Sequence, residues 1–412
     1  MGFGQGLSGL NAASQNLDVI GNNIANSSTV GFKASTIAFA DVYANSRVGL
    51  GVQVAEINQR FTTGNISTTG NQFDMAIDGA KGLFRLVDQS GATVYSRNGQ
   101  FHADKDFNIV NAQGYRLTGF GVDADGQIIN QLSPVKVPIG NIAPKATTEA
   151  SIKANLDSRE KVINSGFAAK DVIRDENHSH SLPLTVYDSL GNPHQVTQYF
   201  VKTAGSGANE TGKSKWDVYY RVDERDAVKG GSLTFDNAGR LEGNGVINLT
   251  VSNIGTTPLP IGSPAAVLNM DFNYGGSTQF GGEFSPSFTQ NGYPTGEYSS
   301  MSIAADGRIV ANYTNGETMT MGAVALADFN NLNGLQPIGG NAWVETAASG
   351  QPVVGQPGTN GLAMLKGQAV EESNVDMSQE LVNMIIAQRT YQANAQTIKT
   401  QDQILQTLIT LR

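Results

Sequence analysis

Apolar side chains recur at alternating spacings of four and three residues between residues 377 and 409. The positions of this heptad seam are Met377, Leu381, Met384, Gln388, Tyr391, Ala395, Ile398, Asp402, Leu405 and Ile409. Such spacing places one mainly apolar stripe along a helix. Neither Gly nor Pro occurs from Val375 onward, and Asp376 followed by Gln379 is typical of an N-cap with a reciprocal capping-box partner. The pattern predicts a long helix at this end of the chain.

A second heptad seam lies at the opposite end of the chain. Its positions are Phe3, Leu7, Leu10, Ser14, Leu17, Gly21 and Ile24. Asn22, Asn23 and Asn26 predict the end of this helix, because asparagine side chains readily bond the neighbouring backbone. Two matching seams predict a coiled-coil-like pair of terminal helices. The polar residues in the seams favour a partly hydrated packing that sets the register.

Burial within one such helix pair does not offset the cost of ordering it. Each apolar side chain contributes roughly 1.5–3 kcal/mol when fully buried, whereas ordering each backbone residue costs about 1–2 kcal/mol. Further burial is therefore needed, either against the body of the chain or against neighbouring copies. We expect the ends to be loose in the monomer and to fold in an assembly, with a helix pair that closes the core of one domain as the alternative. The expected subunit-interface residues are Phe3, Leu7, Leu10, Leu17, Ile24, Leu381, Met384, Tyr391, Ile398 and Leu405.

Short apolar runs separated by Gly-bearing turns fill the middle of the chain, which predicts β-strands. Residues 48–71 are polar and Gly-rich, and we interpret them as an extended connector with one hairpin. Strand patterns over 72–146 return over 289–369, and the stretch 147–288 between them predicts a separate all-β domain. The fold class is α+β and multidomain, with mainly antiparallel β domains.

Composition supports a turn-rich β body rather than a helical one. The 412 residues include 48 Gly and 13 Pro, and only 15% are charged. A net charge of -9 argues against a nucleic-acid groove or an anionic membrane as partner. The absence of Cys excludes disulfides and thiolate chemistry. We find neither a cleavable secretory signal at the start nor an apolar run long enough to span a membrane.

Two aspartate-rich turns match calcium loops only in part. Asp123 and Asp125 precede Gly126, but Pro134 stands where a bidentate glutamate belongs, and the run 104–108 lacks the required sixth-position Gly. We interpret both as aspartate-stabilised turns. No calcium site is expected.

A pair of histidines is the remaining candidate for metal chemistry. His178 and His180 could share one strand face and chelate a metal, with Asp175 and Glu176 beside them, but the segment is polar and loop-like and two-ligand coincidences are common. Neither a nucleophile elbow nor a Ser/His/Asp constellation can be argued. We predict no metal, no cofactor and no enzymatic activity.

Both ends of the chain resemble the signatures of the bacterial flagellar rod and hook protein family. The amino-terminal resemblance covers residues 8–13, 17–26, 31–33 and 39–41, with Asn22, Asn23, Asn26, Gly31, Phe32 and Lys33 as motif residues. The carboxy-terminal resemblance covers residues 373–376, 380–385, 387–389, 391–395 and 399–405. Within the family, total length favours the hook proteins, because rod proteins are much shorter.

The resemblance implies a structural protein. Residues 1–47 and 370–412 would form a terminal helical polymerisation domain, 72–146 and 289–369 one discontinuous β-rich domain, and 147–288 an inserted outer domain. Copies would assemble into a curved, flexible helical tube, a universal joint that passes torque from rod to filament in swimming motility.

The resemblance also implies partners and a location. Expected partners are other copies of the chain, the flagellar rod, the hook cap, the hook–filament junction proteins and the flagellar type III export apparatus. The protein would lie outside the cell, exported without a cleaved signal. A distal rod or junction protein is the alternative within the family, and a secreted β-rich adhesin or enzyme with a helical stalk is the alternative outside it.

Overall fold

The chain forms two compact units in the computed structural model. The structure describes residues 3–42, 49–123, 126–137, 140–163, 167, 177–204, 213–223, 225–250 and 268–410, apart from the side chains of 408–410. The first unit comprises residues 1–139, 299–312 and 318–412, and the second comprises 140–298 and 313–317. This arrangement confirms the predicted α+β class with one β unit inserted in the sequence of another.

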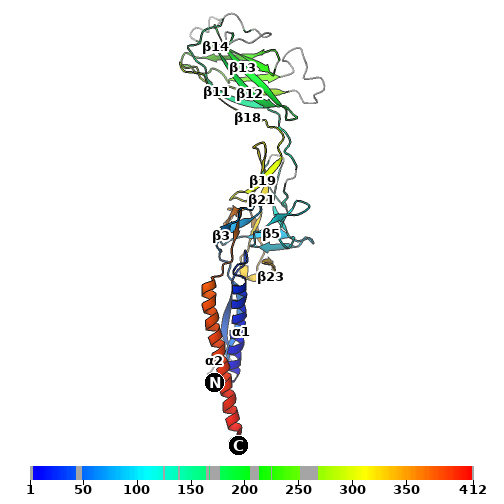
Figure 1. Cartoon of the computed structure of the whole chain (residues 1–412), viewed down its shortest axis with the longest axis vertical. Coiled ribbons are helices and arrows are strands. Elements are labelled where there is room, and N and C mark those ends of the chain that lie inside the picture. Colours follow the sequence, from blue (N-terminus) through cyan, green and yellow to red (C-terminus); the bar gives the residue numbers. More distant parts are fainter. Residues whose placement is uncertain are drawn as a thin grey trace. The chain divides into compact units, whose positions relative to one another are not determined.

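Two four-stranded sheets make up the second unit (Figure 1). Their strand orders are β16-β17-β11-β18 and β12-β13-β14-β15. The strands are β11 Glu149–Asn155, β12 His180–Tyr187, β13 Pro193–Thr203, β14 Ser214–Val222, β15 Val228–Phe235, β16 Val246–Thr250, β17 Asn269–Asn273 and β18 Ser285–Gln290.

The two sheets share one apolar core. Strand β12 alternates buried and exposed residues, so that Leu182, Leu184 and Val186 all point inward. Trp216 from one sheet and Phe272 from the other belong to the same buried cluster. The alternation of buried and exposed residues along β12 shows that only one face of its sheet packs into this core.

His180 lies among aromatic rings at the start of β12. Its imidazole stacks on Phe284 with ring centroids 4.5 Å apart and on Trp216 at 5.7 Å. Burial lowers the pKa of His180 below its ordinary value, although the charges of Glu160 and Asp157 oppose that shift. The folded second unit therefore favours the neutral imidazole.

We expect the second unit to lose stability as pH falls. Because the pKa of His180 is lower in the folded state, the unfolded chain binds its proton first. The stabilisation is complete above the unfolded pKa, near 6.5, and declines as pH drops from there through the folded pKa. Thermal unfolding followed by Trp216 fluorescence in a Trp343→Phe background measures the effect. The variant His180→Phe keeps the stacking but does not titrate, so the decline over this pH range should diminish. An unchanged decline would contradict the assignment.

A large sheet forms the body of the first unit and joins chain segments from both sides of the insertion. Its main path is β19-β20-β21-β9-β5-β6-β24-β23. The strands before the insertion are β1 Ser35–Val42, β2 Gly51–Gln59, β3 Ile66–Thr68, β4 Met75–Asp78, β5 Leu83–Val87, β6 Thr93–Ser96, β7 His102–Ala103, β8 Ile109–Val110, β9 Arg116–Val122 and β10 Ile128–Pro134. The later strands are β19 Tyr298–Ile303, β20 Arg308–Tyr313, β21 Thr318–Val324, β22 Leu326–Asp328, β23 Gln336–Gly339, β24 Ala342–Val344, β25 Val353–Gly355, β26 Met364–Gly367 and β27 Ala369–Glu371, with a 3-10 turn at Leu332–Gly334.

Strand pairing therefore links distant parts of the sequence. Strand β9 pairs with β21, and β6 pairs with β24, all antiparallel. Two smaller antiparallel sheets pair β3 with β27 and β4 with β26. Strand β27 is the last strand before α2.

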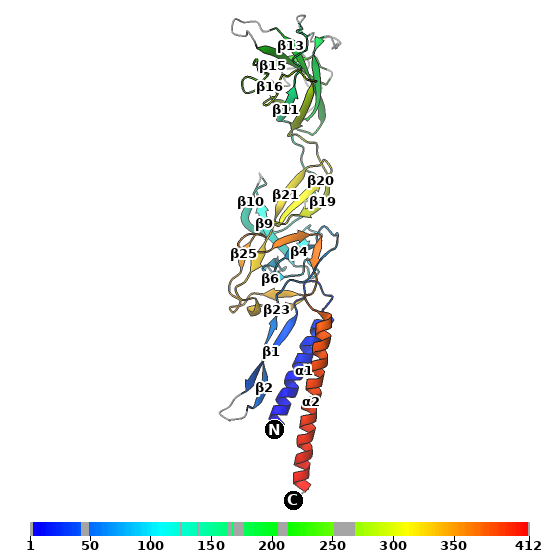
Figure 2. The same cartoon turned by 90° about the vertical axis from the view of Figure 1, so that its left-hand side faces the viewer.

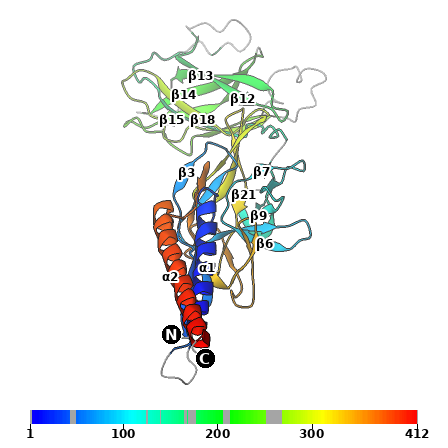
Figure 3. The ribbon, with the colours of Figure 1, turned by 60° about the horizontal axis from the view of Figure 1, so that its bottom comes forward.

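The two terminal helices, α1 Phe3–Ala25 and α2 Met377–Thr410, run side by side (Figures 1 and 3). Helix α2 begins directly after Asp376, whose Oδ1 accepts hydrogen bonds from the backbone N–H groups of Ser378 at 2.9 Å and Gln379 at 3.2 Å. The predicted N-cap is thus present, but the reciprocal hydrogen bond expected between the Gln379 side chain and the backbone of Asp376 is not observed. The Gln379 side chain donates to Asn383 Oδ1 instead, because this neighbour lies one helical turn onward.

Strands β1 and β2 form a hairpin beside α1 (Figure 2). Strand β1 follows the predicted end of the first helix, within the range 1–47 that was assigned to the terminal helical domain. Strand β2 lies within 48–71, where a connector with one hairpin was expected. The hairpin pairs the backbones of the two segments. The domain ranges expected from the sequence otherwise stay a prediction.

Candidate subunit interface

Helices α1 and α2 are antiparallel and contact each other through small side chains. A Cβ atom placed on Gly6 would lie 3.1 Å from Ile398 Cγ1, and one on Gly9 would lie 2.8 Å from Asn394 Oδ1. Ala13 is buried on the same side of α1, and Ala387 is buried on α2. These residues let the two backbones approach closely, so the inward side of the pair carries little apolar bulk.

The small-residue contact turns the predicted seams partly outward. Residues of the expected interface that are exposed are Phe3, Leu7, Leu381, Tyr391 and Leu405, whereas Leu10, Leu17, Ile24, Met384 and Ile398 are half-buried. The heptad pattern predicted that the two seams face each other, whereas in the structure they are only partly turned toward each other. Glycine and alanine shift the contact by one position, because close backbone approach excludes larger side chains. The side chain of Ile409 lies outside the described residues.

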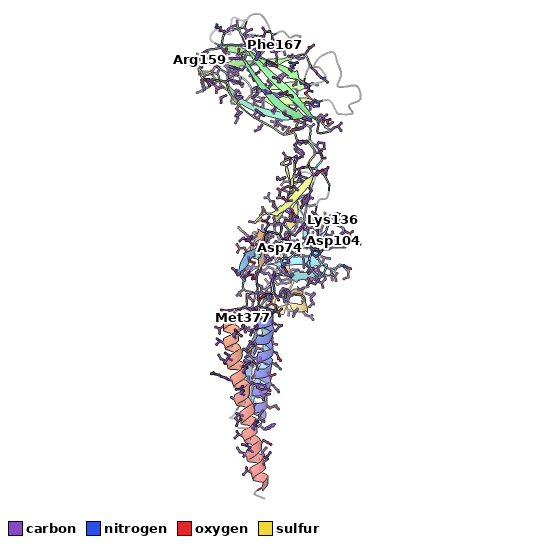
Figure 4. The ribbon with its side chains drawn as sticks, in the orientation of Figure 1. Asp74, Asp104, Lys136, Arg159, Phe167 and Met377 are labelled. Atoms are coloured by element: carbon purple, nitrogen blue, oxygen red, sulfur yellow. The ribbon has the colours of Figure 1, made fainter. Side chains whose placement is uncertain are left out.

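Helix α2 carries additional exposed apolar residues that the heptad analysis missed. Val382, Ile385, Ile386 and Ile404 are between 51% and 58% exposed. Together with Leu381 and Leu405, they form a set of exposed apolar side chains distributed around α2, which we call the outer apolar face of α2. Helix α2 starts at Met377 beside the β body and continues away from it (Figure 4). Large exposed apolar patches mark interaction surfaces in soluble proteins.

The amino-terminal motif residues join α1 to the β body. Asn23 is buried and bonds Ser35 in both directions, since its Nδ2 donates to Ser35 O at 2.8 Å and its Oδ1 accepts from Ser35 N at 2.9 Å. Asn26 Nδ2 donates to Asn22 O at 3.0 Å and ends the helix as predicted. Asn23 therefore does more than cap the helix: it fixes the start of β1.

Gly31 and Lys33 contact the strand that leads into α2. Gly31 has φ of 72° and donates its N–H to Glu371 O at 2.7 Å. A Cβ atom at Gly31 would lie 2.6 Å from Asn98 N, so both its backbone conformation and its surroundings require glycine. Phe32, the residue between them, is half-buried.

A buried ion cluster forms at this junction. Lys33 Nζ lies 2.6 Å from Glu371 Oε1, and Arg97 Nε lies 3.6 Å from Glu371 Oε2. Lys33 also donates to Thr62 O at 2.7 Å, and Gly64 N donates to Glu371 Oε1 at 2.8 Å. One carboxylate thus holds the segment after α1, the segment after β2 and the strand before α2.

Desolvation dominates the electrostatics of this cluster. Burial lowers the pKa of Lys33 below its ordinary value, and the negative charge of Glu371 opposes that shift. Burial likewise lowers the pKa of Arg97, with Glu371 again opposing. Glu371 therefore stabilises both cations, and Asp328 also favours the charged form of Arg97.

The turns considered as calcium sites are closed by their own side chains. Asp104 Oδ1 accepts hydrogen bonds from the backbone N–H groups of Asp106 and Asn108, both at 2.8 Å. The side-chain hydrogen bond from Asn108 lowers the pKa of Asp104 further. Asp123 accepts from Gln127 N at 2.8 Å, and Asp125 lies outside the described residues.

The histidines considered as metal ligands lie against aromatic rings. His178 packs edge-on against Tyr199 with centroids 5.0 Å apart. Asp175 and Glu176 lie outside the described residues. Within the described residues, no group of three or more His, Cys, Asp or Glu side chains could hold a metal ion. No described helix is both long and apolar enough to cross a membrane.

Models of flagellar protein families match successive parts of the chain. The flagella basal body rod protein family matches residues 5–33, and the flagellar hook protein FlgE/F/G D1 domain matches 76–155. The flagellar basal body protein FlaE D2 domain matches 155–293, and the flagellar basal body rod FlgEFG protein C-terminal family matches 366–411.

Curated relatives are similar over their whole length. The flagellar hook protein FlgE of Salmonella typhimurium is 43% identical over 421 residues, and that of Escherichia coli is 44% identical over 420, with 100% of each chain covered. The crystal structure of the Helicobacter pylori flagellar hook protein FlgE2 is 15% identical with a TM-score of 0.54 and covers 74% of this chain and 99% of that one. This last similarity concerns the fold alone.

Proposed function

Because this chain belongs to the flagellar hook protein family and is a structural subunit of the hook, we propose that its copies assemble through α1 and α2 into a curved, flexible helical tube. The tube would act as a universal joint that transmits torque from rod to filament during swimming. The observation that carries this proposal is the outer apolar face of α2, which a single chain leaves exposed. In the polymer, neighbouring copies cover it.

The energetic argument favours contacts between many copies. An apolar side chain contributes roughly 1.5–3 kcal/mol when fully buried, and those on the outer apolar face are about half buried in one chain. Burial of the exposed half of these side chains would be repeated at each copy along a polymer. The expected interface residues Phe3, Leu7, Leu381, Tyr391 and Leu405 stay in this proposal, since their exposure leaves them free to contact a neighbour.

The further partners and the location follow from the same assignment. We propose contacts with the rod, the hook cap and the hook–filament junction proteins at the ends of the tube. The chain would leave the cell through the flagellar type III export apparatus without cleavage of a signal. Residues 147–288 would form the outer domain, and 1–47 with 370–412 the polymerisation domain. The family consists of structural proteins, and the proposal includes no catalytic step.

Electron microscopy of polymer grown from the purified full-length chain tests the proposal. We expect curved tubes, because a hook must bend as it rotates. Straight tubes would support the alternative of a distal rod protein. A chain that stays monomeric at all accessible concentrations would overturn the proposed assembly.

A further inference from the structure

An unfilled groove lies in the first unit between α1, β1 and α2. Its volume is about 250 Å³. One part of its lining is apolar and the other part is polar. The apolar residues are Val19, Ile20, Ile37 and Ile386, and the polar ones are Asn16, Asn23, Ser35, Thr36, Glu380 and Asn383.

Glu380 is the charged residue of the groove and is only 8% exposed. Within the described part of the chain, its carboxylate takes part in none of the hydrogen bonds or ion pairs observed. Asn23, by contrast, is fully paired with Ser35. The oxygens of Glu380 are not among the described buried polar atoms that lack a partner, so the carboxylate is accessible from the groove and can accept hydrogen bonds from a cation that enters it.

The shape and lining of the groove suit an arginine side chain. The apolar wall would contact the aliphatic stem, and the carboxylate would accept two parallel hydrogen bonds from the planar guanidinium. A lysine ammonium lacks this bidentate geometry. The ligand class is therefore a guanidinium on an apolar stem.

Helix α2 carries such a side chain on its opposite side. Arg389 is exposed and, among the described residues, forms no ion pair. It follows Glu380 by nine residues, which is about two and a half helical turns and about 13.5 Å of rise. The arginine thus points away from the groove of its own chain and cannot reach Glu380 in it.

We propose that Arg389 of one copy enters the groove of a second copy and pairs with Glu380 there. This inference rests on the proposed function, which supplies the neighbouring copies. A groove on one side of α2 and an arginine on the other form a heterologous contact, in which each copy donates once and accepts once. Such a contact does not close on itself as a two-fold dimer does, and it propagates into an open helical chain. The pair therefore fixes the direction in which copies add.

Charge reversal tests the pairing. The variants are Glu380→Lys and Arg389→Glu, each in the full-length chain, and polymerisation is followed by sedimentation. Each variant alone places like charges at every contact, and we expect its critical concentration to rise by at least about tenfold. An equimolar mixture of the two should polymerise again, because copies that alternate restore an opposite pair at every groove. The double variant in one chain should also polymerise.

Matched controls separate this result from loss of folding. Lys399→Glu reverses the charge of another exposed cation of α2. An equimolar mixture of Lys399→Glu with Glu380→Lys should not polymerise, because Lys399 is not the proposed partner of Glu380. Glu380→Gln keeps the size of the side chain and should weaken polymerisation without a change in circular dichroism. Failure of both the mixture and the double variant to polymerise, with wild-type chain assembling normally, would overturn the pairing and leave the proposed function intact. A wild-type chain that does not assemble would overturn both.

Discussion

We expect removal of residues 376–412 to prevent polymerisation at ordinary protein concentrations and to leave a monomer with both β units folded. The deletion takes away the outer apolar face of α2, where six side chains retain about half of their exposure. At roughly 0.75–1.5 kcal/mol for the unburied half of each side chain, and about 1.4 kcal/mol for each tenfold change in affinity, the critical concentration should rise at least about a thousandfold. Sedimentation velocity measures it.

The position of the truncation decides whether a loss of assembly can be separated from a loss of folding. Glu371 and Asn374 anchor the β body, since Asn374 Oδ1 accepts from Ala34 N at 2.7 Å and its Nδ2 donates to Arg60 O at 2.6 Å. Ending the chain at Val375 keeps both residues. A truncation further upstream would remove strand β27 as well and confuse assembly with folding.

A milder variant keeps α2 and removes only its apolar character. Replacing Leu381, Ile385 and Ile404 together with Ser should also prevent polymerisation. The matched control replaces Gln392, Gln396 and Gln403 with Ser, at exposed polar positions of the same helix. Normal assembly of the apolar triple variant would contradict the role of the outer apolar face.

Glu371→Gln destabilises the first unit by roughly 3–5 kcal/mol, the range for removing one partner of a buried ion pair. The side chains of Glu371 and Lys33 are fully buried, and that of Arg97 nearly so. Without the carboxylate, two cations stay buried beside a neutral amide. The change also weakens the junction from which both helices extend.

The two tryptophans separate this effect from the second unit. Trp343 belongs to the core of the first unit and Trp216 to that of the second. Urea unfolding followed by fluorescence in a Trp216→Phe background therefore reports the first unit. Glu372→Gln is the matched control, because Glu372 bonds Asn65 on the exposed surface, and its effect should stay within about 0.5 kcal/mol. Equal effects of the two variants would contradict the role of the ion cluster.

Periodicity was sufficient to predict the helices but not which side of each helix faces the other. Leu7 and Leu381 follow the heptad spacing, yet both are exposed. The contact is decided by Gly6 and Gly9, where the backbones approach closely, and neither of these glycines is a position of the heptad seam. The spacing of small residues along α1 could have indicated this contact.

Only one member of the buried ion cluster was singled out from the sequence. Lys33 belonged to a motif singled out by resemblance, but its partner Glu371 lies in a strand far along the chain, and no local pattern pairs them. The same holds for strands β9 and β21, which flank the insertion and still pair with each other. Such contacts arise from the fold, because the insertion separates neighbours in sequence without separating them in the first unit.

The burial of Glu380 could not be predicted from the sequence. Glu380 lies in the carboxy-terminal motif, yet nothing in a helical pattern distinguishes a buried glutamate from an exposed one. Its burial depends on α1 and β1. Only the packed helices reveal a carboxylate that lacks a cation.

Hydrogen exchange along α2, compared between monomer and polymer, tests the central claim most directly. The helices are proposed to obtain most of their burial from neighbouring copies. We therefore expect amides in residues 381–407 to exchange readily in the monomer and to become protected by at least about a hundredfold in the polymer. Strong protection of these amides in the isolated monomer, without further gain on assembly, would contradict it.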